Sequence, residues 1–290
     1  MQDIIVTKLK KLILESNNFK SSYWSGLKFS SDLENIYGHF GFGTFEKKTK
    51  IRNIAHNFFQ FLIYGIKVFQ MDEYKKIKIF LDKFQRQIDI DVIKHLYVFN
   101  HLKKNIKAPK SIAVIGDGKA NFITNAYLNY PKSVLYSINL PEVLIHDYFI
   151  LKKYGIYKEA DISVVENEHD LSDESKKVFF ITPNNINMLL NLKIELFVNI
   201  CSFQEIKNKD IAKYFDLIKT NESLFYCCNR RYKKLPDGEE VIFKNYPWGE
   251  GKKIFEEECP WLKNVYFFRP PFIKKYDGSH DHKLISYKFS

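Results

Sequence analysis

Two glycines separated by one residue give the clearest chemical signal in the sequence. The apolar run Ile112–Ile115 reads as a β-strand, Gly116-Asp117-Gly118 follows it directly, and a helical pattern begins a few residues later. Glycine permits a tight turn and a close approach of a ligand to the backbone, because it has no Cβ. A helix that begins there adds exposed N–H groups. The pattern indicates a ligand-binding turn, with an ordinary strand-to-helix turn as the alternative.

Asn139 lies where a ribose-binding side chain is expected, about 20 residues past the glycines at the end of the next strand-like run. An acidic residue is usual there, whereas Asn supplies one carbonyl acceptor and a donor. Helix capping is the alternative role, because Asn is a good N-cap. A dinucleotide site would also require a small residue at position 121, which is Asn121 here, so NAD and FAD are disfavoured.

Three side chains are candidates for acid–base chemistry. Glu205 follows the strand-like run that ends at Ile200, and its alternative role is a first-turn carboxylate that complements the helix dipole. His280 and His282 precede the last apolar run and would share one side of an extended segment. The His-Asp-His spacing leaves two alternatives, a metal site and a surface turn. Of these we do not favour the metal site, and we expect no bound metal.

The elements that must position these residues change character near residue 108. Residues 1–107 carry helical patterns with one apolar face, and we expect a helical region that caps the site or mediates dimerisation. Residues 108–290 alternate strand-like and helical patterns, which predicts an α/β, Rossmann-like fold with a mostly parallel sheet. Segment 229–262 reads as polar and irregular. The apolar runs 265–268 and 284–289 are expected to form an antiparallel, hairpin-like edge.

Composition sets broad limits. The 290 residues carry a formal charge of +11, which favours acidic partners, although scattered lysines also fit a solvated surface. The longest apolar stretch, Phe58–Phe69, is too short to span a bilayer. The first residues lack a signal-peptide pattern, and the four cysteines form no C-x-x-C pair, so we expect a cytoplasmic protein with reduced thiols.

Four segments resemble the sugar O-methyltransferase family, whose members use S-adenosylmethionine and occur in polysaccharide gene clusters. The resemblance covers roughly residues 110–290, with a looser similarity near Tyr23-Trp24. The matching segments are Gly116-Asp117-Gly118, Asn139-Leu140-Pro141-Glu142-Val143-Leu144, Asn199-Ile200-Cys201-Ser202-Phe203-Gln204-Glu205-Ile206 and Tyr226-Cys227-Cys228-Asn229-Arg230. The chain departs from the family in having Val114 and Asn139 at positions that are commonly acidic.

The resemblance implies a class I methyltransferase domain with S-adenosylmethionine as cofactor. It places the cofactor along the glycine turn, Asn139 and Leu140, with the loop 182–185 near the adenine and Asn199 near the sulfonium. The cofactor residues implied in this way are Gly116, Asp117, Gly118, Asn139, Leu140, Thr182, Asn184, Asn199 and Cys201. For Asn184 the alternative is a simple turn.

The same resemblance implies methyl transfer to a sugar hydroxyl in surface-polysaccharide synthesis. The acceptor would be a sugar, a nucleotide sugar or a polysaccharide, and a base would remove the hydroxyl proton. Arg230 and Arg231 would pair with an acidic group of the acceptor, and Tyr246 and Trp248 would stack on a sugar face, unless they are solvated or core residues.

Two other functions stay open. A non-catalytic Rossmann-like scaffold that has lost cofactor affinity fits Val114 and Asn139, and a nicotinamide-dependent enzyme acting on a nucleotide sugar is opposed by Asn121. Arg269-Pro270-Pro271-Phe272 is similar to a motif of methyltransferases that modify amino groups of nucleic acids, but it begins with Arg and follows the wrong strand. We therefore expect no nucleic-acid substrate.

Overall fold

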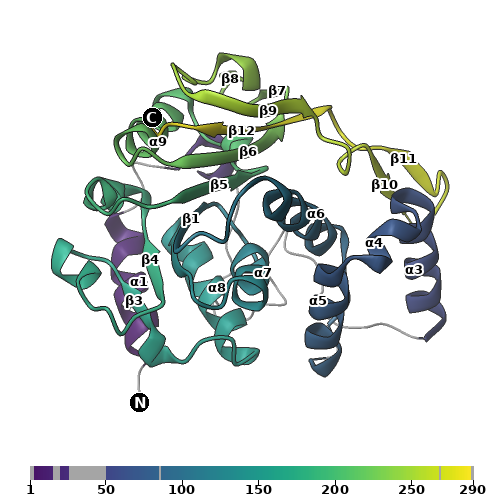
Figure 1. Cartoon of the computed structure of the whole chain (residues 1–290), viewed down its shortest axis with the longest axis horizontal. Helices are drawn as coiled ribbons and strands as arrows, with labels where there is room; N and C mark the ends of the chain where they lie inside the picture. Colours follow the sequence, from purple (N-terminus) through teal and green to yellow (C-terminus); the bar gives the residue numbers. More distant parts are fainter. Residues whose placement is uncertain (1–2, 16–19, 26–49, 85, 268, 289–290) are drawn as a thin grey trace.

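The computed structural model describes residues 3–15, 20–25, 50–84, 86–267 and 269–288. Its centre is an eight-stranded sheet (Figure 1). In spatial order the strands are β3 (Ile162–Val164), β4 (Val178–Ile181), β2 (Val134–Ile138), β1 (Ser111–Ile115), β5 (Leu196–Ile200), β6 (Leu224–Arg230), β12 (His280–Ser286) and β9 (Lys252–Glu258). All neighbours from β3 to β6 pair in parallel, and β12 is antiparallel to β6 and to β9. The predicted α/β, Rossmann-like sheet, mostly parallel with an antiparallel C-terminal edge, is confirmed.

The parallel strands are buried on both faces, which explains their unbroken apolar sequences. In β1, Ile112 and Val114 contribute to the core on one face, and Ala113 and Ile115 contribute to the core on the other. Because successive side chains of a strand point to opposite faces, alternate residues of β1 belong to the two different cores. The chain leaves β1 toward β2 on one side and reaches β5 on the other, so the strand order reverses at β1. In open parallel sheets a crevice forms at such a point.

Helices cover both faces of the sheet. They are α1 (Ile4–Glu15), α2 (Ser22–Ser25), α3 (Lys50–Tyr64), α4 (Ile66–Gln70), α5 (Asp72–Lys83), α6 (Ile90–Asn105), α7 (Asn121–Asn129), α8 (Pro141–Lys153) and α9 (Asn208–Thr220). Helices α1, α7 and α8 contribute to one core, and α9 contributes to the other. Pro141 is the first residue of α8, where its missing N–H costs no hydrogen bond.

The described part of the first 107 residues is helical, as predicted, and is tied to the sheet domain. Helix α1 packs on α8 and β3, and its fully buried Leu9 belongs to the same core as Phe180 of β4. Helix α6 packs on α7, and its N-cap residue is Asp89, whose Oδ1 accepts a hydrogen bond from the Val92 N–H at 3.0 Å. Helix α3 packs on the C-terminal hairpin strand β10 (Asn264–Tyr266) (Figure 1).

The prediction for the C-terminal edge was wrong in two respects. Segment 229–262 is not irregular, because it contains β9 and the small hairpin of β7 (Tyr232–Lys234) and β8 (Glu240–Ile242). The run at 265–268 does not join the last strand: β10 pairs instead with β11 (Ile273–Lys275), away from the main sheet. Strand β9 was missed because an edge strand is mostly exposed, and its Lys and Glu residues hide the apolar pattern.

Within the described ranges, no helix is both long and apolar enough to cross a membrane. The four cysteines are unpaired, and Cys227, Cys228 and Cys259 are buried.

Candidate functional site

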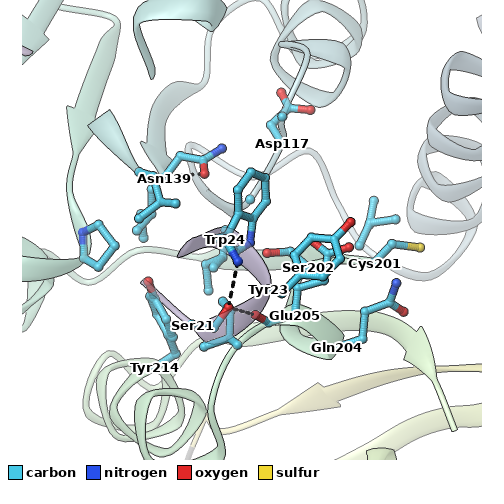
Figure 2. Close-up of a pocket in the computed structure, with 18 of the residues that line it drawn as sticks. Ser21, Tyr23, Trp24, Asp117, Asn139, Cys201, Ser202, Gln204, Glu205 and Tyr214 are labelled. Carbon is cyan, nitrogen blue, oxygen red and sulfur yellow. Dashed lines mark hydrogen bonds between the residues drawn. The ribbon is translucent and has the colours of Figure 1, made fainter. Parts of the chain in front are cut away.

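A pocket of about 390 Å³ opens at the carboxyl ends of β1, β2 and β5, where the strand order reverses (Figure 2). The residues that follow these strands form one wall, and further lining comes from the N-terminal segment 21–24, from helices α6 and α9, and from the loop after β4. The predicted residues that line the pocket are Gly116, Asp117, Gly118, Asn139, Leu140, Cys201, Glu205 and Arg230. These residues are spread over positions 116–230 of the sequence, and the sheet topology brings them together.

The glycine turn has the strained backbone and the close contact that require glycine. Gly116 and Gly118 have φ values of +78° and +71°, in the left-handed region. A Cβ on Gly116 would lie 2.0 Å from the Ser202 Oγ. The turn after β1 therefore passes against the residue that follows β5, and no larger side chain fits at position 116.

Two carboxyl groups occupy the amino end of α7. Asp117 accepts hydrogen bonds from the N–H groups of Phe122 and Ile123 at 2.7 and 2.9 Å, and Asp147 accepts one from Ala120 at 2.8 Å. Burial raises the pKa of Asp117 to about 6, although those N–H groups oppose the shift. These donors are no longer available to a pyrophosphate. The structure thus adds to the argument from Asn121 against a dinucleotide.

Asn139 presents an amide donor to the pocket. Its Oδ1 accepts the N–H of Leu140 at 2.9 Å, and its buried Nδ2 has no hydrogen-bond partner among the residues that the structure describes. Asn139 is not the N-cap residue of α8, because that position is held by Leu140, whose side chain makes no capping hydrogen bond. A buried amide without a partner is costly, so its NH₂ group is suited to donate to a ligand oxygen.

Three amide side chains hold the loops after β5 and β6 in place. Asn199 is fully buried, and its Nδ2 donates to the Ile115 carbonyl at 3.0 Å. The Asn229 Nδ2 donates to the Asn199 Oδ1 at 2.7 Å, and the Arg230 N–H donates to the Gln204 Oε1 at 3.0 Å. Asn199 therefore lies behind the pocket wall and positions it. These three residues belong to the last two of the four family-like segments.

Glu205 ends the short 3₁₀ helix η5 (Phe203–Glu205) and lines the pocket. Burial raises the pKa of its carboxyl to about 7, although the charges of Lys233, Lys94 and Arg230 oppose the shift. A carboxyl with a pKa near neutrality can accept a proton and release it again under physiological conditions. The Ser21 Oγ donates to the Glu205 carbonyl at 2.5 Å, so the N-terminal segment is fixed to this residue.

Aromatic rings from distant parts of the chain enter the pocket. Tyr23 and Trp24 belong to α2, and Figure 2 shows both rings within the group of labelled residues that includes Asn139, Tyr214 and Glu205. Tyr276 also lines the pocket. Sequence reasoning noted Tyr23-Trp24 only as a loose similarity, and nothing in the sequence linked Tyr214 or Tyr276 to the glycine turn.

A charged cluster from α6 lines the pocket next to the glycine turn. The Asp91 carboxylate lies 2.9 Å from the Lys94 Nζ and 2.7 Å from the Lys119 Nζ. Burial disfavours ionisation of Asp91, but the two lysine charges outweigh it and hold its pKa well below the usual range. This cluster was missed because α6 reads from the sequence as an ordinary amphipathic helix.

Several predicted residues do not line the pocket. Thr182 is buried, and its neighbours Pro183 and Ile186 line the pocket instead of Thr182 and Asn184. Arg231 pairs with Asp281, with 2.8 Å between Nε and Oδ1. Tyr246 is a buried core residue. Trp248 packs against that same core, donates to the Phe243 carbonyl at 3.1 Å and lies under the Lys283 ammonium. The positions of Thr182, Asn184, Arg231, Tyr246 and Trp248 therefore do not support the cofactor or substrate contacts predicted for them.

The two histidines lie in β12 behind the pocket. His280 is buried next to Arg230, and its Nδ1 lies 3.1 Å from the Gly278 carbonyl oxygen. His282 is fully buried, with 3.2 Å from its Nδ1 to the Tyr226 hydroxyl and 3.1 Å from its Nε2 to the Glu257 Oε1. No group of three His, Cys, Asp or Glu side chains arranged to hold a metal occurs in the described ranges.

Replacing His282 by Gln is expected to make the fold less sensitive to acid. Burial, with the charge of His101, lowers the pKa of His282 to about 4, below its unfolded value near 6.5. The unfolded chain therefore binds more protons between pH 6.5 and 4, and stability falls as the pH falls through that range. Chemical denaturation measures this loss as a fall in the unfolding free energy from pH 6.5 to pH 4. The fall should be smaller in the variant than in the wild type, by on the order of 1–3 kcal/mol. An unchanged pH slope would contradict a buried neutral imidazole.

No protein-family model matches the chain, and a search of curated proteins gave no match. Among solved structures, the TrmK structure from M. capricolum with S-adenosylhomocysteine is 14% identical with a TM-score of 0.42, covering 67% of this chain and 70% of that chain. The methyltransferase domain of bacterial CtHen1-CN is 10% identical with a TM-score of 0.41, covering 68% and 100%. A chain of the fibrillarin/Nop5p complex is 8% identical with a TM-score of 0.43, covering 68% and 81%. Similarities at this level carry no functional argument.

Proposed function

We propose that this protein is an S-adenosylmethionine-dependent O-methyltransferase that acts on a sugar hydroxyl. The proposal rests on three features that line the same pocket. They are the glycine turn, the Asn139 amide, whose Nδ2 has no hydrogen-bond partner among the described residues, and the Glu205 carboxyl with its raised pKa. Support for the sugar comes from the resemblance of the segments around residues 116, 139, 205 and 230 to sugar O-methyltransferases.

The residues of the pocket fit an adenosyl amino acid. The Asn139 NH₂ group would donate to a ribose hydroxyl, and the apolar residues Leu140, Pro183 and Ile186 would pack on the adenine. Asp91 and Lys94 would hold the ammonium and carboxylate of the amino acid part. The cavity volume lies within the usual range of ligand sites, roughly 300–1,000 Å³.

Glu205 would act as the general base. S-adenosylmethionine supplies a methyl group on a positively charged sulfur, so the protein needs mainly to align the acceptor oxygen and remove its proton. Glu205 is the only one of the three predicted bases that lines the pocket, since His280 and His282 lie behind it. The rings of Tyr23, Tyr214 and Tyr276 offer apolar faces with polar tips, which suits a sugar. Arg230 would pair with an acidic group of the acceptor.

Isothermal titration calorimetry tests the cofactor directly. S-adenosylhomocysteine should bind in a saturable way, and excess NAD should not compete for the site, because the donors at the amino end of α7 are occupied. No heat and no thermal shift at millimolar S-adenosylhomocysteine would favour the non-catalytic scaffold. Displacement by NAD would favour the nicotinamide-dependent enzyme.

Asn139 provides a test of the ribose contact. Asn139→Ala should weaken S-adenosylhomocysteine binding by about tenfold, since one hydrogen bond from a buried donor is worth roughly 1–1.5 kcal/mol. Asn139→Asp can keep the bond from the Leu140 N–H and offers an acceptor to the ribose hydroxyls, so it should bind at least as tightly as the wild type. Equal affinities for wild type and Asn139→Ala would remove Asn139 from the cofactor site.

A further inference from the structure

One end of the molecule combines exposed apolar side chains with positive charge. We call it the tip and define it as two segments, residues 50–71 and the described residues of 260–276 (260–267 and 269–276), which contain α3, α4, β10 and β11. Figure 1 shows these elements together at one end of the long axis. The tip is built on contacts of α3 with β10, in which Phe59 and Tyr266 stack with ring centroids 5.7 Å apart.

Helix α3 buries one face and exposes an apolar one. His56 and Gln60 face inward, and the Gln60 Nε2 donates to the Ile88 carbonyl at 2.6 Å. The opposite face carries large apolar side chains at helical spacing, and α4 continues it. Their exposed fractions are 81% for Ile51, 69% for Ile54, 55% for Phe58, 43% for Phe61, 50% for Leu62 and 54% for Ile66.

The hairpin β10–β11 extends this apolar surface. Phe272 is half exposed and stacks on Phe59 of α3 with ring centroids 5.8 Å apart, and Phe267 and Ile273 are also exposed. A soluble domain rarely leaves so many neighbouring Phe, Ile and Leu side chains in water unless they contact a partner.

The tip is also positively charged. The two segments contain seven Lys or Arg residues and no Asp or Glu, although acidic residues make up 34 of the 290 in the chain. All seven are exposed: Lys50, Arg52, Lys67, Lys263, Arg269, Lys274 and Lys275. The nearest acids in the sequence, Asp72 and Asp277, lie just beyond the two segments. A second copy docking by the same surface would bring like charges together.

We propose that the tip docks on an anionic lipid surface. Phe, Ile and Leu side chains on one helix face insert at the boundary between headgroups and acyl chains, and flanking Lys and Arg residues attract acidic headgroups. A nucleic acid would satisfy the seven positive charges but would leave the Ile and Leu side chains in water. Apart from Tyr276, the last residue of the tip, the residues that line the pocket lie outside the tip, and none of the exposed side chains used here is among them. This proposal therefore stands independently of the proposed enzymatic function.

Vesicle flotation with the full chain tests the proposal. The protein should float with vesicles of equal parts phosphatidylserine and phosphatidylcholine, and far less with pure phosphatidylcholine or at high salt. Lys274→Glu with Lys275→Glu should weaken binding by at least about 30-fold, since each basic residue near such a surface contributes roughly a fivefold gain. Phe58→Ser with Leu62→Ser should weaken it by at least about tenfold. These side chains are exposed, so the variants should keep the wild-type circular dichroism.

Matched controls are available elsewhere on the surface. Ile79→Ser removes an apolar side chain that is 64% exposed on α5, and Lys132→Glu with Lys209→Glu reverses two exposed charges outside the tip. Both controls should bind the vesicles like the wild type. Equal binding to neutral vesicles would overturn the proposal. Two other results would also overturn it. One is that the double variant Phe58→Ser with Leu62→Ser turns a dimer into a monomer in light scattering but floats like the wild type. The other is that the protein binds RNA through the tip and does not bind vesicles.

Discussion

Glu205→Gln is expected to lower methyl transfer to an active sugar acceptor by about 10²–10⁴-fold while leaving the affinity for S-adenosylhomocysteine unchanged. The amide fills the same space but cannot take a proton. In the wild type, kcat should rise with pH through about 7, since Glu205 acts as a base only when it is ionised and burial raises its pKa to about that value. The rise should be absent in the variant. Glu205→Asp should restore part of the activity and a pH-dependent rise.

A second measurement on Glu205→Gln needs no substrate. A carboxyl whose pKa is higher in the folded protein than in the unfolded chain makes the fold less stable as the pH rises from about 4.5 through 7. Gln does not ionise, so the variant should be more stable than the wild type at pH 8, by on the order of 1–2 kcal/mol in chemical denaturation. The stability difference between variant and wild type should therefore be larger at pH 8 than at pH 5. An equal difference at the two pH values would show that folding does not raise the pKa of Glu205.

Gly116→Ala should abolish measurable S-adenosylhomocysteine binding and destabilise the fold by about 2–4 kcal/mol. The φ of +78° disfavours any residue with a Cβ, and that Cβ would lie 2.0 Å from the Ser202 Oγ. The turn after β1 or the loop after β5 must therefore move, and both line the pocket. Calorimetry and thermal melting measure the two effects.

Two variants separate the steric overlap from backbone strain. Gly155→Ala has a similarly positive φ of +57°, but its Cβ would meet nothing within 4 Å, so it should cost about 1 kcal/mol and leave cofactor binding intact. Adding Ser202→Gly to Gly116→Ala removes the overlapping side chain and should recover part of the lost stability. A Gly116→Ala protein that binds S-adenosylhomocysteine normally would exclude this turn from the cofactor site.

The sequence predicted the sheet well because fully buried parallel strands leave an unbroken apolar run. Each strand from β1 to β6, except the three-residue β3, lies within or beside such a run, and the glycine turn and Asn139 follow from their places at strand ends. The C-terminal edge was harder to predict. Strand β9 is largely charged, and β12 begins with His280, Asp281 and His282, whose polar side chains do not indicate a buried strand.

A place at a strand end accounts for part of the predicted site. Gly116, Asn139 and Cys201 directly follow β1, β2 and β5 and line the pocket, whereas Thr182 and Arg231, which directly follow β4 and β6, do not. Trp248 and Tyr246 do not, because a residue-type argument for stacking on a sugar cannot distinguish a pocket from a core. Lys94 and Tyr276 were not predicted, since their place in the pocket lining depends on how α6 and the C-terminal segment pack on the sheet.

The chain of amides from Asn199 through Asn229 to Gln204 has a consequence for how the protein responds to acidity. Its members link the ends of β5 and β6 and support the backbone just before Glu205, and amide side chains carry no titrating proton. A carboxylate or histidine in their place would add a second titrating group beside Glu205. Here the protonation of Glu205 changes no charge within these three amides, so its effect on activity should reverse when the pH is restored.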